Sequence, residues 1–440
     1  MRGYIPADAL PNLHKYAYKG VDKSLTSKYI LNPFWTWFVT LWPLSVAPNT
    51  ITLSGLSIIF LNFATLLYND PEYLTESGGV SLPSWIYFSF AIGLFLYQSF
   101  DAIDGKQARR TGMAGPLGEM FDHGCDAMNT TLEAVLACHA LNLGRSWWTV
   151  VSQVATLATF YLTTWEEYHT GQLYLGRFSG PVEGILMICA IFTISGIYGP
   201  SFWDTGILTF LRLTNVPYIN KLPDIPLNES FMVFSAFAVF FNIQSSYRNV
   251  RRAMLDAHKS TLRPLLLLLP FLVSASLQLL WLAHPRASAP AILHSPLLVP
   301  FLCAWGLQFA HQVGRMILAH TTQGGCAFPV FDWMWVWTGL CVVDAYLPRI
   351  LPGRPPLVQS SPMGRAVLVY GTLALSLVLY AQFVVRVIND ITEYLGIACF
   401  TVRKKGKDGQ WRESVPQAQP QENGGAGGGA GGDGVVKKKQ

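Results

Sequence analysis

The sequence predicts an all-α integral membrane protein with about ten transmembrane helices. Hydrophobic residues make up 51% of the 440 residues and charged residues only 13%, whereas a soluble globular domain carries about 25% charged residues. Many apolar stretches approach the ~20 residues that a helix needs to cross a bilayer. The 14 Trp and 18 Tyr residues also fit aromatic belts at the two membrane surfaces.

Ten apolar stretches are the candidate spans. They lie near 45–68, 84–103, 117–141, 147–168, 182–198, 230–247, 263–283, 296–318, 331–349 and 364–388. Ahead of them, residues 24–43 mix aromatic and polar residues, which favours an interfacial helix over a span. We therefore divide the chain into an N-terminal segment (1–43), a first group of membrane helices (44–200), the remaining membrane helices (201–400) and a tail (401–440).

The positive charges predict how the chain is oriented. An even number of spans puts both termini on one side of the membrane, and Lys and Arg favour the cytosolic side. This arrangement places the following basic residues on the same side of the membrane: Lys15, Lys19, Lys23, Lys28, Lys106, Arg109, Arg110, Arg248, Arg251, Arg252, Lys259, Arg263, Arg403, Lys404 and Lys405. We expect both termini to be cytosolic. The net charge of +5 is too diffuse to indicate a nucleic-acid partner.

The C-terminal tail is rich in Gly, Gln and Pro from about residue 406 onward, so we expect it to be flexible and disordered. It ends Lys437-Lys438-Lys439-Gln440. Lysines at these positions resemble the dilysine retrieval signal of endoplasmic-reticulum membrane proteins, and a solubilising charge cluster explains them equally well. If replacing Lys437 and Lys438 by Ser left the location of the protein unchanged, the signal hypothesis would fail.

Four aspartates lie in a short window between two apolar runs. Asp101 and Asp104 are spaced i, i+3 at the end of one run, and Asp122 and Asp126 are spaced i, i+4 in the next. Each spacing puts two carboxylates on one face of a helix. A connector with Gly112, Gly115 and Pro116 suits a short turn between them. Because carboxylates at membrane depth are costly without a partner, we expect two antiparallel helices to direct all four into one metal pocket.

Oxygen ligands favour Mg²⁺ or Mn²⁺ over zinc. Four carboxylates can hold two ions ~4 Å apart, an arrangement that promotes displacement at phosphorus. Gly105 and Gly118 leave room for a ligand close to the backbone. Arg109 offers a planar guanidinium suited to phosphate. Metal and arginine together stabilise charge on a transferring phosphoryl group.

The window carries a family signature. Its residues match D-G-x2-A-R-x8-G-x3-D-x3-D without a gap, at Asp104, Gly105, Ala108, Arg109, Gly118, Asp122 and Asp126. The chain therefore resembles the CDP-alcohol phosphotransferases. The flanking stretches, Ala47-Pro48-Asn49 and the number of spans make it similar to the eukaryotic choline/ethanolamine phosphotransferases. The resemblance is strongest over about residues 40–190, which makes 44–200 the expected catalytic part.

The resemblance implies an enzyme that transfers phosphocholine or phosphoethanolamine from CDP-choline or CDP-ethanolamine to diacylglycerol and releases CMP. It implies that Asp101, Asp104, Asp122 and Asp126 bind the metal ions. The residues that it implies for the CDP part are Asn49, Gly105, Ala108 and Arg109, with Gly118 beside them. The expected location is the endoplasmic-reticulum membrane, with the Golgi as the alternative. The sequence leaves open the oligomeric state, although many members of the family are homodimers.

The acceptor hydroxyl needs a base, and carboxylates committed to metal are poor bases. His123, with an unperturbed pKa of ~6.5, is our predicted base. Glu119 is spaced i, i+4 from it and is predicted to orient its ring. The alternatives are Asp126 as the base and a purely structural His123.

Trp165, Tyr168 and Glu183 offer the aromatic faces and carboxylate that a cationic headgroup requires, and an interfacial belt explains them equally well. Two other functions stay open at this point. One is a CDP-diacylglycerol-dependent phosphatidyltransferase such as a phosphatidylinositol synthase, which is usually shorter. The other is a metal-binding membrane transporter, which would commonly show internal repeats.

Overall fold

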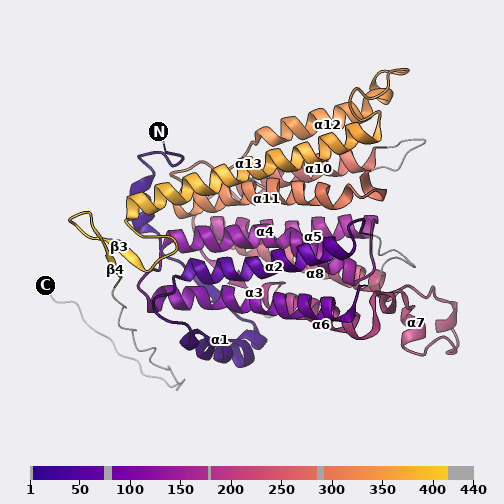
Figure 1. Ribbon diagram of the computed structural model, residues 1–440, viewed down its shortest axis with the longest axis horizontal. Helices are drawn as coiled ribbons and strands as arrows, with labels where there is room; N and C mark the ends of the chain where they lie inside the picture. Colours follow the sequence, from indigo (N-terminus) through magenta and orange to yellow (C-terminus); the bar gives the residue numbers. More distant parts are fainter. Residues whose placement is uncertain (1–2, 74–81, 177–179, 285–291, 415–440) are drawn as a thin grey trace.

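The computed structural model describes residues 3–73, 82–176, 180–284 and 292–414, and its long helices run side by side in one bundle (Figure 1). The long helices are α2 (Pro48–Asn69), α3 (Ser84–Arg110), α4 (Pro116–Ala140), α5 (Trp147–Thr170), α6 (Ile185–Tyr198), α8 (Leu227–Asp256), α10 (Leu269–Ala283), α11 (Leu298–Thr321), α12 (Trp333–Ile350) and α13 (Pro362–Leu395). Short helices α1 (Asn32–Phe38), α7 (Ile207–Phe210) and α9 (Leu262–Leu266) lie between or beside them.

Helices occupy all ten predicted ranges, but length and composition mark fewer of them as membrane spans. Five described segments are long and apolar enough to cross a membrane: Pro48–Asn69, Ser84–Arg110, Pro181–Tyr198, Leu262–Ala283 and Pro362–Leu395. The predicted spans over α4, α5, α8, α11 and α12 do not meet this test. In α4 the reason is its polar content, since it carries Glu119, Asp122, Asp126 and Glu133.

The centre of the bundle is formed by α4 and α11, which pack against each other and against α5 and α13. The buried residues of α11 lie on every face of the helix, as expected for a helix inside a bundle. Gly306 lets the two central helices approach closely, because a Cβ atom there would lie 2.2 Å from Oγ1 of Thr131 on α4. Such close approach at small residues is common between membrane helices.

The N-terminal segment is attached to the end of α3 that carries the aspartates. Residues 24–43 are largely helical, with the π-helix η2 (Ser27–Leu31), α1 and the 3₁₀ helix η3 (Val39–Leu41). Nε2 of Gln107 donates to the carbonyls of Pro43 and Val46 at 2.9 and 3.0 Å, and Nη1 of Arg110 donates to the Val39 carbonyl. Strand β1 (Gly20–Asp22) pairs in parallel with β2 (Leu173–Leu175), which follows α5.

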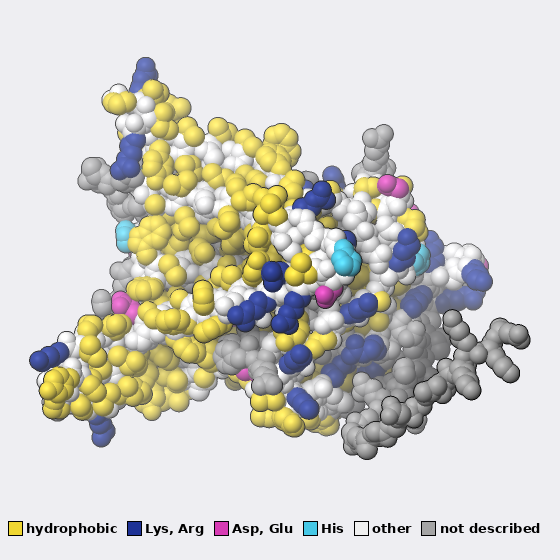
Figure 2. Space-filling view, turned by 180° about the vertical axis from the view of Figure 1, so that it is seen from behind, with side chains coloured by type: hydrophobic (Ala, Val, Ile, Leu, Met, Phe, Trp, Pro, Cys, Tyr) yellow, Lys and Arg dark blue, Asp and Glu magenta, His cyan; other side chains and the backbone are white. Residues whose placement is uncertain are grey.

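Both described ends of the chain lie at the same end of the bundle (Figure 1). The amide of Ile5 donates to Asp390 of α13 at 2.9 Å. The chain after α13 forms the hairpin of β3 (Arg403–Lys405) and β4 (Trp411–Glu413). In Figure 2, seen from behind, most Lys and Arg side chains gather on the half of the face that holds this end, whereas the other half is largely hydrophobic.

The predicted tail (401–440), which we expect to be disordered from about residue 406, begins with this hairpin. Its two strands pair in antiparallel register, and Gly409 has the positive φ of 79° that the turn requires. Nη2 of Arg412 pairs with Asp408 at 2.5 Å across the turn. Composition does not predict these local contacts, because the residues after the hairpin are rich in Gly and Gln. The lysines at 437 and 438 lie outside the described residues.

Candidate active site

The turn between α3 and α4 brings the two pairs of aspartates to the same end of the bundle. Helix α3 ends at Arg110, and the amide of Met113 donates back to the Ala108 carbonyl at 2.8 Å. Gly112 has a φ of 67°, which glycine adopts without strain. Pro116 then starts α4 at a first-turn position that suits proline. The predicted short connector between antiparallel helices is confirmed.

Three of the four aspartates form one cluster. Carboxylate oxygens of Asp101, Asp122 and Asp126 all lie within 4.8 Å of one another, and each residue is half-buried. Oδ1 of Asp101 and Oδ1 of Asp122 are buried and have no hydrogen-bond partner among the described residues. Buried carboxylates without hydrogen bonds are unfavourable, so this donor set fits a hard divalent cation with oxygen ligands.

The fourth aspartate lies beside the cluster and is held by another helix. Asp104 is buried and accepts a hydrogen bond from Oγ1 of Thr52 on α2. Its carboxylate also lies next to that of Asp122. A second orienting contact comes from Tyr97, whose hydroxyl donates to Oδ1 of Asp126 at 2.5 Å.

Neither Thr52 nor Tyr97 was among the residues predicted from the sequence. Spacing gives a weak signal for both. Tyr97 lies one turn before Asp101 on α3, and Thr52 lies one turn after Asn49 on α2.

The residues expected to contact the CDP part leave open space near the cluster. A Cβ atom on Gly118 would meet nothing within 4 Å, and one on Gly105 would meet only Nη1 of Arg109, at 3.8 Å. Arg109 is exposed and Ala108 is buried. Asn49 is buried, and its amide donates to Sγ of Cys399 at 3.4 Å.

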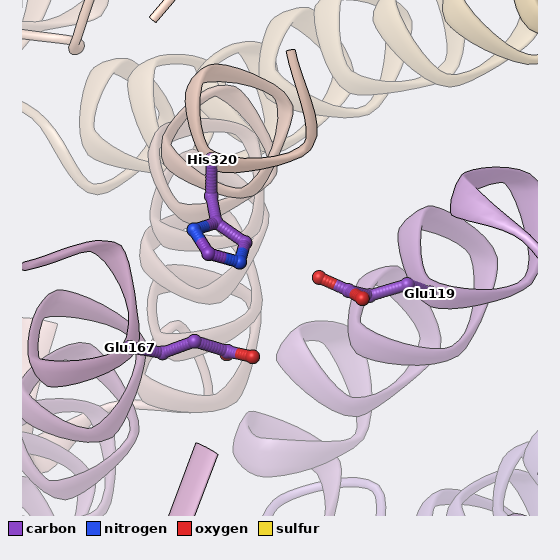
Figure 3. Close-up of side chains that lie close together, drawn as sticks. All are labelled: Glu119, Glu167 and His320. Atoms are coloured by element: carbon purple, nitrogen blue, oxygen red, sulfur yellow. The ribbon is translucent and has the colours of Figure 1, made fainter. Parts of the chain in front are cut away.

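The predicted contact by which Glu119 orients the His123 ring is not seen among the described residues. Both carboxylate oxygens of Glu119 are buried without a hydrogen-bond partner among the described residues. Glu119 instead converges with Glu167 of α5 and His320 of α11 (Figure 3). Spacing along α4 allowed the contact with His123, but the neighbouring helices placed the side chain elsewhere. His123 is half-buried and lies near His320.

The three residues predicted for the headgroup have separate surroundings. Trp165 is 1% exposed, and its indole donates to the Pro264 carbonyl at 2.9 Å, which makes it a packing residue. The ring of Tyr168 lies 5.1 Å from that of Phe328. Glu183 accepts a hydrogen bond from Ser24 of the N-terminal segment. The contacts of these described residues give them no common pocket.

The N-terminal segment carries one residue near the aspartate cluster. Tyr18, two residues before β1, lies within electrostatic range of Asp101, Asp122, Glu167 and Arg109. The segment that carries it is fixed on both sides, since β1 pairs with β2 and Ser24 bonds to Glu183.

Comparison with known proteins places this geometry in a family. Residues 45–223 match the family model described as CDP-alcohol phosphatidyltransferase, and this range contains all four aspartates. Cholinephosphotransferase 1 of Saccharomyces cerevisiae is 38% identical over 413 residues, which cover 91% of this chain and 98% of that protein. Choline/ethanolaminephosphotransferase 1 of Arabidopsis thaliana is 36% identical over 409 residues, which cover 92% and 99%.

An uncharacterized CDP-alcohol phosphatidyltransferase class-I family protein of Schizosaccharomyces pombe is 39% identical over 405 residues, covering 90% of this chain and 97% of that protein. Similarity over this share of the chain covers the helices after the aspartate signature as well as the signature itself. The chain belongs to the CDP-alcohol phosphatidyltransferase family, whose members are transferases.

Proposed function

We propose that this chain transfers phosphocholine, phosphoethanolamine or both from the CDP-alcohol to 1,2-diacylglycerol, forming phosphatidylcholine or phosphatidylethanolamine and releasing CMP. The observation that carries the proposal is the cluster of Asp101, Asp122 and Asp126 at the facing ends of α3 and α4. The names of the relatives in yeast and Arabidopsis support the choice of substrate. The extent of similarity favours this function over a phosphatidylinositol synthase.

In the proposed reaction, Asp101, Asp122 and Asp126 would hold Mg²⁺ or Mn²⁺, and Asp104 beside them would complete a site for two ions. The ions would neutralise charge on the pyrophosphate and on the phosphoryl group in transfer. The exposed guanidinium of Arg109 binds the phosphates from the open side. Asn49, Gly105, Ala108 and Gly118 border the space assigned to the CDP part.

The base removes the proton of the acceptor hydroxyl while its oxygen forms a bond to the β-phosphorus and the phosphoanhydride bond to CMP breaks. We assign this role to His123. Its main competitor, Asp126, already accepts the Tyr97 hydroxyl and belongs to the carboxylate cluster. A carboxylate engaged in this way is a weaker base than a neutral imidazole. We also propose that Glu183 and Tyr168 contact the cationic headgroup. Trp165 is left out, since it is buried and its indole donates to the Pro264 carbonyl.

We further propose ten membrane helices, a location in the endoplasmic-reticulum membrane (or the Golgi) and cytosolic termini. The basic side chains at the end of the bundle that carries the aspartates support this orientation (Figure 2). The soluble donor would then reach the site from the cytosol, and diacylglycerol would enter from the bilayer. A homodimer is compatible with this arrangement.

The deciding experiment measures CMP release by the purified protein in lipid nanodiscs with diacylglycerol and Mg²⁺. CDP-choline and CDP-ethanolamine are supplied side by side, which also establishes the headgroup preference. Wild type should release CMP in step with formation of the phospholipid, and Asp122→Asn should not. Product from CDP-diacylglycerol and inositol, or Mn²⁺ uptake into proteoliposomes without any CMP release, would instead support the alternative functions.

A further inference from the structure

Three side chains from three helices converge at a second place in the bundle. Glu119 lies on α4, Glu167 on α5 and His320 on α11, and one donor atom of each lies within 4.8 Å of the other two. Figure 3 shows the two carboxylates and the imidazole pointing toward one another. No residue of this group belongs to the aspartate cluster.

The two carboxylates of the group are buried, His320 is half-buried, and no Lys or Arg within the described ranges pairs with either carboxylate. Glu119 is 8% exposed and Glu167 is 3% exposed. Neither oxygen of Glu119 has a hydrogen-bond partner among the described residues, and none of the ion pairs within the described ranges includes Glu119 or Glu167. Two buried carboxylates side by side repel each other and lose their hydration, so the arrangement requires a cation or a proton.

A tyrosine packs against the imidazole of this group. The ring of Tyr16 lies edge-on to that of His320, with centroids 6.0 Å apart. Its hydroxyl is buried and has no hydrogen-bond partner in the described part of the chain. Buried polar atoms without partners need an explanation, and a bound ion is one that also accounts for the converging carboxylates.

The donor set indicates which cation would fit. Ligand atoms around one ion at ~2.1 Å are at most ~4.2 Å apart, so small side-chain movements bring these three onto a single ion. A trimethylammonium group is larger and is recognised mainly through aromatic faces. An imidazole ligand suits zinc or manganese better than magnesium. We propose that Glu119, Glu167 and His320 form a second metal site, separate from the aspartate cluster, that binds Zn²⁺ or Mn²⁺.

An ion at this site would join α4 to α5 and α11 through coordinate bonds. Glu119 precedes Asp122 by three residues and His123 by four, so the ion would fix the part of α4 that carries the proposed base and a proposed metal ligand. The site itself is defined by its own three side chains. Its existence therefore does not depend on the proposed transferase reaction.

The test uses the full-length protein in nanodiscs, stripped with EDTA and reloaded with Mn²⁺. Electron spin-echo spectroscopy detects a ¹⁴N nucleus bound to Mn²⁺, and Asp101, Asp122 and Asp126 supply no nitrogen. Wild type should show ¹⁴N modulation that is lost in His320→Asn. The signal should persist in Asp101→Asn/Asp122→Asn, because that variant alters only the aspartate cluster.

Metal content provides a second readout. After reloading with Zn²⁺ and washing, Glu167→Gln should retain about one ion per chain less than wild type by mass spectrometry. Glu133→Gln is the matched control, since Glu133 lies on α4 and its two oxygens are buried without hydrogen-bond partners among the described residues. It should bind as much Zn²⁺ as wild type.

Absence of ¹⁴N modulation in wild type would overturn the proposal. So would equal metal content in wild type and Glu167→Gln accompanied by weaker binding of CDP-choline, which would assign the group to the headgroup instead. If His320→Asn does not elute as a folded protein in size-exclusion chromatography, Glu167→Gln decides. Turnover is measured separately, so a failure of the proposed transferase function leaves this result interpretable.

Discussion

The hydroxyl of Tyr97 donates a hydrogen bond of 2.5 Å to Oδ1 of Asp126, which joins α3 to α4 at the carboxylate cluster. Tyr97 is 3% exposed, so this contact is shielded from water. Asp126 is also one of the three carboxylates of the cluster. Tyr97 is therefore a positioning residue for a proposed metal ligand.

Removing that hydroxyl should weaken metal binding. In Tyr97→Phe we expect the Mg²⁺ concentration for half-maximal turnover to rise ~10-fold or more, because residues that orient metal ligands contribute at this level. A Mg²⁺ titration of CMP release measures the effect. Tyr87→Phe is the control, since Tyr87 is also buried on α3 but its hydroxyl lies near His139, away from the cluster. An equal shift in both variants would contradict the assignment.

The contact between Thr52 and Asp104 leads to a second prediction. Thr52→Val removes the hydroxyl that bonds to Asp104 and leaves a buried carboxylate oxygen without that donor. We expect a ~10-fold weaker apparent affinity for Mg²⁺ in turnover assays. Thr52→Ser keeps the hydroxyl and should restore most of the affinity. Loss of activity in both variants, with unchanged Mg²⁺ dependence, would indicate a packing role instead.

The assignment of the base can be tested with metal and CDP-alcohol both saturating. His123→Ala should lower turnover ~100-fold or more while leaving the KM for CDP-choline nearly unchanged, because the imidazole acts on the acceptor. Steady-state kinetics of CMP release provide both values. A variant that retained most of the wild-type turnover would show that His123 is not the base.

The close approach of α4 and α11 leads to a prediction about stability. In Gly306→Ala the new Cβ would lie 2.2 Å from Oγ1 of Thr131, so side chains or helices must move. We expect a loss of ~1–3 kcal/mol in the free energy of unfolding, seen as a lower midpoint in thermal unfolding in detergent.

Two further variants make this stability test specific. Gly339→Ala on α12 should cost little, since a Cβ atom there meets nothing within 4 Å. Replacing Thr131 by Ala in the Gly306→Ala background should recover part of the loss. If the two glycine variants were equally unstable, the close contact of position 306 with Thr131 would not be the cause of the loss.

Much of the local structure follows from residue order. The i, i+3 and i, i+4 spacing of the aspartates places them on helix faces, and Gly112, Gly115 and Pro116 predict the turn that joins the helices. These features depend on neighbours within a few residues. The hairpin after α13 is also local, with Arg403–Lys405 paired to Trp411–Glu413. Composition does not predict it, because the later part of the tail is rich in Gly and Gln and favours disorder over the whole tail.

The sequence by itself determined the helical membrane class, the family signature and the two helices that carry the aspartates, because each depends on composition or on short spacing. Only the tertiary structure decided which partners those residues have. Thr52 and Asp104 are 52 residues apart, and Glu119 on α4 lies near Glu167 on α5 and His320 on α11. Contacts over such separations depend on how the helices pack. For this reason the spacing along α4 predicted a contact of Glu119 with His123, whereas the packed helices place Glu119 beside α5 and α11.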